Sequence, residues 1–163
     1  MGWTGARVNK RRVAIVAGLR TPFVKTATDY EGLTALDLAA ATVTELMERS
    51  SVDPGDVGQL VYGQVVPSTN APNIAREVVL RVGLPHQVDA FSVVRACATS
   101  TQALVNASMS ILAGDADVAI AGGADSLSRP PITYSEPVID ALVRANSAKT
   151  AMEKARAFSG VRL

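Results

Sequence analysis

The chain has 163 residues, 48% of them hydrophobic, and its 16 basic and 15 acidic side chains leave a formal net charge of +1. This length can bury one core of useful size, and the balanced charge argues against partners bound through electrostatics, such as nucleic acid or an anionic membrane. The longest apolar runs, 13–19 and 118–123, are far shorter than the roughly 20 residues of a membrane-spanning helix. We therefore expect a globular protein without a transmembrane segment.

The first residues and the cysteine content indicate the compartment. Residues 1–11 are basic and lack the apolar stretch and cleavage site of a secretory signal, so we expect a flexible basic arm there. Cys97 is the only cysteine, and one cysteine cannot form an intramolecular disulfide. Both features favour the cytoplasm.

The first half of the chain alternates strand and helix patterns. The run 13–17 is apolar, rich in β-branched residues and closed by Gly18, which predicts a buried first strand. Thr34 can cap a helix that runs to about Arg49. Turn-forming residues at 53–55 precede a second strand within 57–66.

The pattern continues to residue 125. Asn73 can cap a helix that Gly83 stops, and 89–94 predicts a third strand. A helix from Cys97 to 113 ends at Gly114, and 117–123 predicts a fourth strand. The order β-α-β-α-β-α-β is typical of an α/β layered fold with a mixed, mainly parallel sheet.

The composition changes near residue 126. Residues 126–137 contain three prolines, and an amphipathic helical pattern follows them. We therefore divide the chain into an arm at 1–11, a domain at 12–125 and a second unit at 126–163.

Cys97 is the candidate catalytic residue. It stands where the third strand hands over to a helix, so its sulfur faces the amino end of that helix, where unpaired amides and the helix dipole favour thiolate over thiol. The thiolate is the form that attacks carbonyl carbon. Ligands of open α/β sheets also bind at the carboxyl ends of the strands.

The residues around Cys97 resemble a known family. The segment Ser92-Val93-Val94-Arg95-Ala96-Cys97-Ala98-Thr99-Ser100-Thr101-Gln102-Ala103-Leu104 resembles the cysteine motif of thiolases, and three further segments follow the family's order: 18–23, 71–76 and 121–128. The segments 71–77 and 95–100 are most similar to the bacterial 3-ketoacyl-CoA thiolases of fatty-acid β-oxidation. Val94 stands where the family usually has a small polar residue, and Asp125 is shorter than the usual glutamate.

The resemblance implies an acetyl-CoA C-acyltransferase with a thiolase-like layered fold. Cys97 would attack the keto carbon of a 3-ketoacyl-CoA, release acetyl-CoA and hold the shortened acyl chain as a thioester until coenzyme A accepts it. Coenzyme A is then a co-substrate, and neither a tightly bound cofactor nor a metal is expected. The resemblance also implies an acyl-CoA substrate, a homo-oligomer and a hydratase/dehydrogenase subunit as partners.

The family also needs a histidine, a second cysteine and oxyanion donors, all from its carboxy-terminal half. The only histidine here, His86, follows Pro85 in a predicted loop that matches no family motif. We therefore expect a truncated thiolase whose residues 126–163 begin the family's loop domain. Cys97 should accept an acyl group without turnover, and the chain should self-associate or need a complementing chain.

Three other functions compete with this one. A dinucleotide-binding domain is rejected because no Gly-x-Gly-x-x-Gly occurs. A β-ketoacyl synthase-like condensing enzyme also carries a cysteine at such a turn, and a non-catalytic thiolase remnant could serve as an interaction module. Basic residues of the second unit either meet the phosphates of coenzyme A or form a solvated helix face: Arg144, Lys149, Lys154 and Arg156.

Overall fold

The computed structural model describes residues 12–159, so the arm predicted at 1–11 lies outside the described residues. The chain divides into two compact units, one up to Pro131 and one from Ile132 onward. Within residues 12–159, no helix is both long and apolar enough to cross a membrane.

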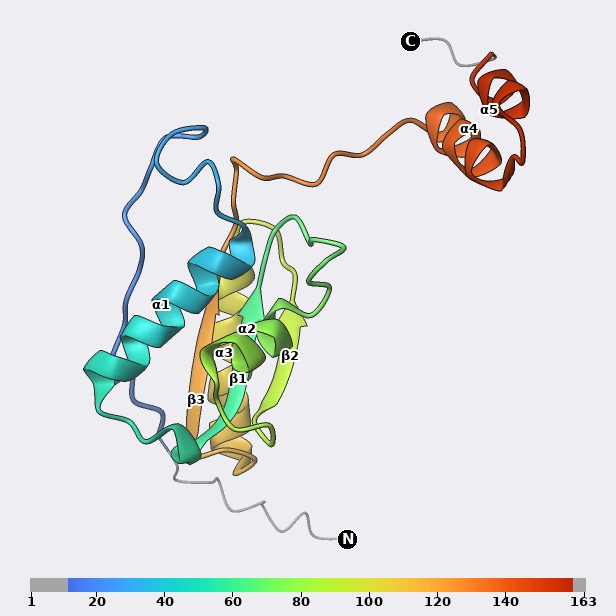
Figure 1. Cartoon of the computed structure of the whole chain (residues 1–163). Coiled ribbons are helices and arrows are strands. Elements are labelled where there is room, and N and C mark those ends of the chain that lie inside the picture. The colour runs from blue at the N-terminus through green and yellow to red at the C-terminus, as the bar shows by residue number, and fades with distance from the viewer. Residues whose placement is uncertain (1–11, 160–163) are drawn as a thin grey trace, which may run out of the picture. The chain divides into compact units, whose positions relative to one another are not determined.

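A three-stranded sheet forms the centre of the first unit (Figure 1). Its strands are β1 (Val57–Gly63), β2 (Asp89–Val93) and β3 (Val118–Gly123), arranged in the order β2-β1-β3. Both pairings are parallel, and the register places Leu60 of β1 between Ala90 and Ile120. The carboxyl ends of the strands therefore lie along the same edge of the sheet.

Helices cover both faces of this sheet. On one face lie α1 (Ala35–Ser50) and α2 (Ile74–Val82), and α3 (Thr99–Ala113) lies on the other (Figure 1). The alternation of β1 explains this division, because Leu60 and Tyr62 join the core under α1 and α2, whereas Val61 packs with Ala103 and Ala107 of α3. The sequence-based prediction of an α/β layered fold is thus confirmed.

The predicted first strand is wrong. Residues 13–17 have no strand assignment, and the side chains of Ile15 and Val16 are 75% and 80% exposed. A strand needs a neighbour for its backbone N–H and C=O groups, and none of the three strands of the described chain pairs with this segment. The apolar run correctly indicates a tendency to extended structure but carries no information about the neighbour that would pair with it.

A capping box starts α1. Thr34 Oγ1 accepts a hydrogen bond from the Asp37 backbone N–H at 3.1 Å, and Asp37 Oδ2 accepts from the Thr34 N–H at 2.9 Å and from its hydroxyl at 2.6 Å. Asp37 also forms an ion pair with Arg81 of α2, with Nη2 and Oδ1 2.5 Å apart. The bonds from Thr34, followed by the charge of Arg81, lower the pKa of Asp37 below its usual value of 3.8.

This carboxylate makes the first unit acid-sensitive. Because its pKa is lower in the folded than in the unfolded chain, its stabilising effect is present above the unfolded value and is lost as the pH falls through the folded value. Asp37→Asn should lower the free energy of unfolding at about pH 7 and reduce its further decrease on acidification to about pH 3. Urea unfolding of both proteins at the two pH values measures this. An unchanged acid sensitivity in Asp37→Asn would contradict it.

Within residues 132–159, the second unit contains two helices. These are α4 (Glu136–Ser147) and α5 (Ala151–Ala157), which pack against each other with Ala141 buried. Thr150 and Glu153 form a capping box at the start of α5. The four basic side chains predicted for this unit are exposed. The boundary predicted near residue 126 stays a prediction.

Candidate active site around Cys97

Cys97 is an exposed free thiol on the turn that joins β2 to α3. β2 ends at Val93 and α3 begins at Thr99, so the cysteine stands beyond the carboxyl end of β2 and just before the helix. No side chain caps the amino end of α3, whose N-cap residue is Ala98. The thiol is therefore accessible to a substrate and lies beside the positive end of the helix dipole.

The turn has an unusual backbone conformation. The Ala98 N–H donates to the Arg95 carbonyl at 3.0 Å, which closes a four-residue turn around Ala96 and Cys97. Ala96 has a φ of 45°, in the left-handed region. A non-glycine residue there costs about 1–2 kcal/mol, and such strain is typically stored at functional sites.

Asp125 binds the backbone just after the carboxyl end of β1, the strand beside β2. Its carboxylate follows β3 and accepts hydrogen bonds from the Val65 N–H at 2.9 and 3.0 Å and from the Val66 N–H at 3.2 Å. The Ala124 N–H donates to the Gly63 carbonyl at 3.0 Å. The acidic residue after the double glycine therefore ties the loop after β3 to the loop after β1.

Close approach between α3 and the sheet needs glycine. A Cβ on Gly123 would lie 2.5 Å from Ser100 Oγ, and one on Gly63 would lie 2.2 Å from the Val93 carbonyl oxygen and 2.3 Å from Thr99 Cγ2. These distances are far below van der Waals contact, so any side chain there would push α3 and the Cys97 turn away from the strands.

His86 does not lie near Cys97. It is an exposed residue before β2, whereas Cys97 follows β2, so the two stand at opposite ends of this strand. The His86 carbonyl accepts a hydrogen bond from Arg76 Nη2 at 3.0 Å, and the Val88 carbonyl accepts from Arg76 Nη1 at 3.1 Å. The structure thus brings no imidazole of the described chain to the thiol.

Asn73 has a structural function. Its Oδ1 accepts from the Arg76 N–H at 3.2 Å and from the Ser92 hydroxyl at 3.0 Å, and its Nδ2 donates to the Ala90 carbonyl at 3.0 Å. The side chain both caps α2, as the sequence predicts, and attaches it to β2.

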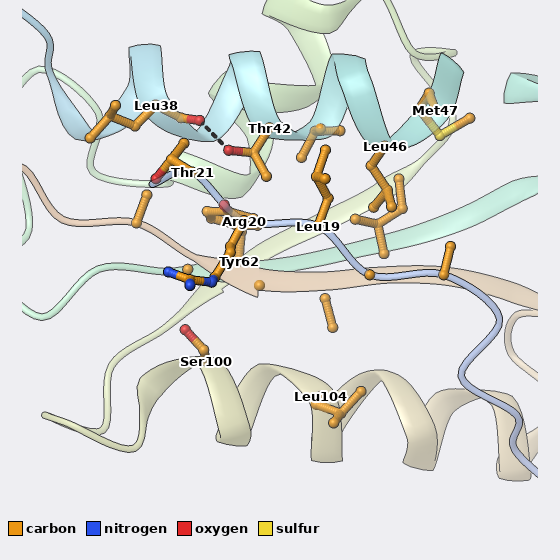
Figure 2. Close-up of a pocket in the computed structure, with 18 of the residues that line it drawn as sticks. Leu19, Arg20, Thr21, Leu38, Thr42, Leu46, Met47, Tyr62, Ser100 and Leu104 are labelled. Carbon is orange, nitrogen blue, oxygen red and sulfur yellow. Dashed lines mark hydrogen bonds between the residues drawn. The ribbon is translucent and has the colours of Figure 1, made fainter. Parts of the chain in front are cut away.

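A cavity of about 710 Å³ lies elsewhere in the first unit. Figure 2 shows it between α1, β3 and α3, with Leu46, Tyr62 and Leu104 among its labelled lining residues. Residues 13–24 form another wall, and Cys97 is not a lining residue. The sequence does not predict this cavity, because the apolar run 13–17 predicts a strand paired in the sheet and not a cavity wall.

Three lining side chains show the character of this cavity: Tyr62, Arg20 and Phe23. Burial raises the pKa of Tyr62 to about 12, and its ring leaves no room for a side chain on Gly122, whose Cβ would lie 2.5 Å from Cε2. The Arg20 guanidinium stacks 4.4 Å from the centre of the Phe23 ring. None of these groups points to a reaction, so Cys97 stays the candidate nucleophile.

Comparison with known proteins places the chain in a family. The thiolase N-terminal domain matches residues 13–160. The chain is 53% identical over 152 residues to the 3-ketoacyl-CoA thiolase of Yersinia enterocolitica, with 93% of this chain and 35% of that protein covered. It is 54% identical over 143 residues to the 3-ketoacyl-CoA thiolase of Shewanella denitrificans, with 88% and 33% covered.

Solved structures share the fold. The Bacillus anthracis acetyl-CoA acetyltransferase superimposes with a TM-score of 0.71 at 29% identity, over 74% of this chain and 31% of that one. The Acat5 thiolase of Ascaris suum in complex with coenzyme A gives a TM-score of 0.69 at 23% identity, over 72% and 31%. The chain spans about a third of the length of the curated relatives it matches. It belongs to the thiolase family, within which it corresponds to the amino-terminal domain.

Proposed function

We propose that the chain carries the nucleophile of a 3-ketoacyl-CoA thiolase, and that this nucleophile is Cys97. The observation that carries the proposal is an exposed thiol on a strained strand-to-helix turn, in a chain about half identical to 3-ketoacyl-CoA thiolases. Attack on a carbonyl needs an accessible sulfur, and Cys97 is exposed on the turn before α3.

The proposed reaction has two steps. The Cys97 sulfur adds to the keto carbon of the substrate, and the bond between that carbon and its neighbour toward the coenzyme A thioester breaks. The electron pair of this bond leaves with acetyl-CoA, which takes up a proton, and the shortened acyl group stays on Cys97 as a thioester. The thiol of coenzyme A then attacks the thioester, releases an acyl-CoA and returns the cysteine.

Proton transfer limits what this chain does alone. The carbanion that departs in the first step can take its proton from water, whereas the second step needs a base for the thiol of coenzyme A. The sequence contains no second cysteine, and His86 lies at the other end of β2. We therefore propose that the chain can be acylated but turns over negligibly.

The surroundings of the reaction follow from this function. The substrate would be an acyl-CoA, with coenzyme A as co-substrate. A 3-ketoacyl-CoA arises by oxidation of a 3-hydroxyacyl-CoA, which supports a hydratase/dehydrogenase subunit as partner besides further copies of the chain. An exposed free cysteine suits the reducing cytoplasm.

The experiment is acylation followed by intact-protein mass spectrometry. Acetoacetyl-CoA should add one acetyl group, located on Cys97 by peptide mapping, and Cys97→Ser should remain unmodified. Steady release of acetyl-CoA should be absent. Acylation of Cys97→Ser would disprove Cys97 as the nucleophile. Steady turnover by the unchanged chain would disprove the proposal that the chain stops at the acylated form. An unacylated Cys97 that still reacts with iodoacetamide would favour a non-catalytic interaction module.

A further inference from the structure

Thr99 binds the backbone just before Cys97 through its side chain, in addition to its own N–H, which donates to the Ala96 carbonyl at 3.1 Å. Thr99 Oγ1 accepts a hydrogen bond from the Arg95 N–H at 2.8 Å and donates one to the Ala96 carbonyl at 2.7 Å. The hydroxyl thus binds the residue before Ala96 and Ala96 itself. Ala96 has a φ of 45°, a conformation that alanine rarely adopts by itself. The two bonds of the hydroxyl flank this residue.

The same side chain is anchored to the sheet. Thr99 is 3% exposed, and its Cγ2 occupies the space beside Gly63 of β1, where a Cβ would approach to 2.3 Å. The methyl group therefore fixes the side chain against the central strand while the hydroxyl faces the turn. Through Thr99, strand β1 therefore influences the position of the turn that carries Cys97.

We propose that Thr99 is a positioning residue for Cys97: it holds Ala96 in the left-handed conformation and thereby sets the direction in which the thiol meets its electrophile. The proposal rests on the proposed function of Cys97 as nucleophile. Thr99 needs no contact with the substrate for this, because it acts through the backbone of residues 95–97. Its methyl group stabilises the fold, whereas its hydroxyl orients the nucleophile.

Three variants separate the hydroxyl from the methyl group. Thr99→Val keeps the shape and removes both hydrogen bonds, and Thr99→Ser keeps the hydroxyl and removes the methyl group. Thr101→Val is the matched control, because Thr101 lies exposed on the same helix. Far-UV circular dichroism and urea unfolding establish that each variant is folded before its reactivity is compared.

Two reactions are measured on each protein. Iodoacetamide alkylation of Cys97 reports the accessibility and orientation of the thiol without any thiolase chemistry. Acylation by acetoacetyl-CoA, followed over a range of concentrations, gives a maximal rate and a half-saturating concentration. Thr99→Val should lower the maximal acylation rate about tenfold, a change of about 1.4 kcal/mol in the barrier, and leave the half-saturating concentration unchanged. Its alkylation rate should shift severalfold, whereas Thr99→Ser and Thr101→Val should stay within about twofold of the unchanged chain.

Hydrogen exchange of the Arg95 amide tests the hydroxyl of Thr99 directly, first in the unchanged chain and then in Thr99→Val. The Arg95 amide donates to Thr99 Oγ1, so it should exchange slowly in the unchanged chain and faster in Thr99→Val. Fast exchange of this amide in the unchanged chain would overturn the proposal. So would a Thr99→Val protein with unchanged reactivity, or a Thr99→Ser protein as impaired as Thr99→Val. If acetoacetyl-CoA fails to acylate the unchanged chain, the proposed function fails, while alkylation and exchange still decide the function of Thr99.

Discussion

Gly63→Ala should destabilise the first unit more than a methyl group added at any other glycine of the sheet. The new Cβ would lie 2.2 Å from the Val93 carbonyl oxygen and 2.3 Å from Thr99 Cγ2. Val93 is the register partner of Gly63 on β2, so relief of the first contact requires β1 and β2 to separate at their carboxyl ends. We expect the free energy of unfolding to fall by about 3 kcal/mol, measured by urea unfolding followed by circular dichroism.

Gly32→Ala provides the control for this experiment. A Cβ at Gly32 has no atom within 4 Å, so the substitution should leave the stability unchanged or raise it by a few tenths of a kcal/mol, at most about 1 kcal/mol. Combining Gly63→Ala with Thr99→Ser removes the methyl contact but not the contact with the Val93 carbonyl, so it should restore only part of the loss. Equal urea midpoints for Gly63→Ala and Gly32→Ala would show that the strands can move apart without cost.

Ile74→Ala should have the second large effect, through loss of core packing. Ile74 opens α2, is 0% exposed and belongs to the cluster formed by α1, α2 and the sheet. Removing three buried carbon atoms from such a position costs about 2–5 kcal/mol, because the lost transfer free energy is joined by the cost of the cavity. Ile74→Val should cost about 0.5–1.5 kcal/mol.

Leu80→Ala tests whether burial is the cause. Leu80 lies on the same helix and is similar in size, but it is 48% exposed. Its truncation should cost less than about 1 kcal/mol. Urea unfolding at one pH compares the free energies of unfolding of the three variants with that of the unchanged chain. A loss for Leu80→Ala as large as that for Ile74→Ala would mean that helix formation, rather than core packing, determines the stability of α2.

Most elements of the first unit follow from local signals in the sequence. Thr34 and Asn73 predict the starts of α1 and α2 because a side-chain oxygen can accept from the first free amides, and the structure has both bonds. Gly114 predicts the end of α3, where it adopts a positive φ. Strand ends are less sharp, since Val65 and Val66 continue the apolar pattern of β1 but lie outside it.

The remaining features depend on contacts that no local pattern contains. Residues 13–17 belong to none of the three strands in the order β2-β1-β3, and they line the cavity together with residues of β3. The position of Cys97 between a strand and a helix is predictable, because apolar periodicity changes there. The left-handed Ala96 is not, because alanine gives no signal for that conformation, which depends on hydrogen bonds from the buried Thr99 and from the Ala98 N–H.

The strand order also sets the sequence in which the sheet can assemble. Leu60 pairs with Ala90 on one side and with Ile120 on the other, so the β1–β3 pairing closes a loop about twice as long as the β1–β2 pairing. Longer loops close at greater entropic cost, and non-local parallel pairings form slowly. β1, α2 and β2 should therefore form first. Because α3 packs against both β1 and β3, the Cys97 turn should reach its final conformation only when β3 docks, which makes the reactivity of the thiol a late marker of folding.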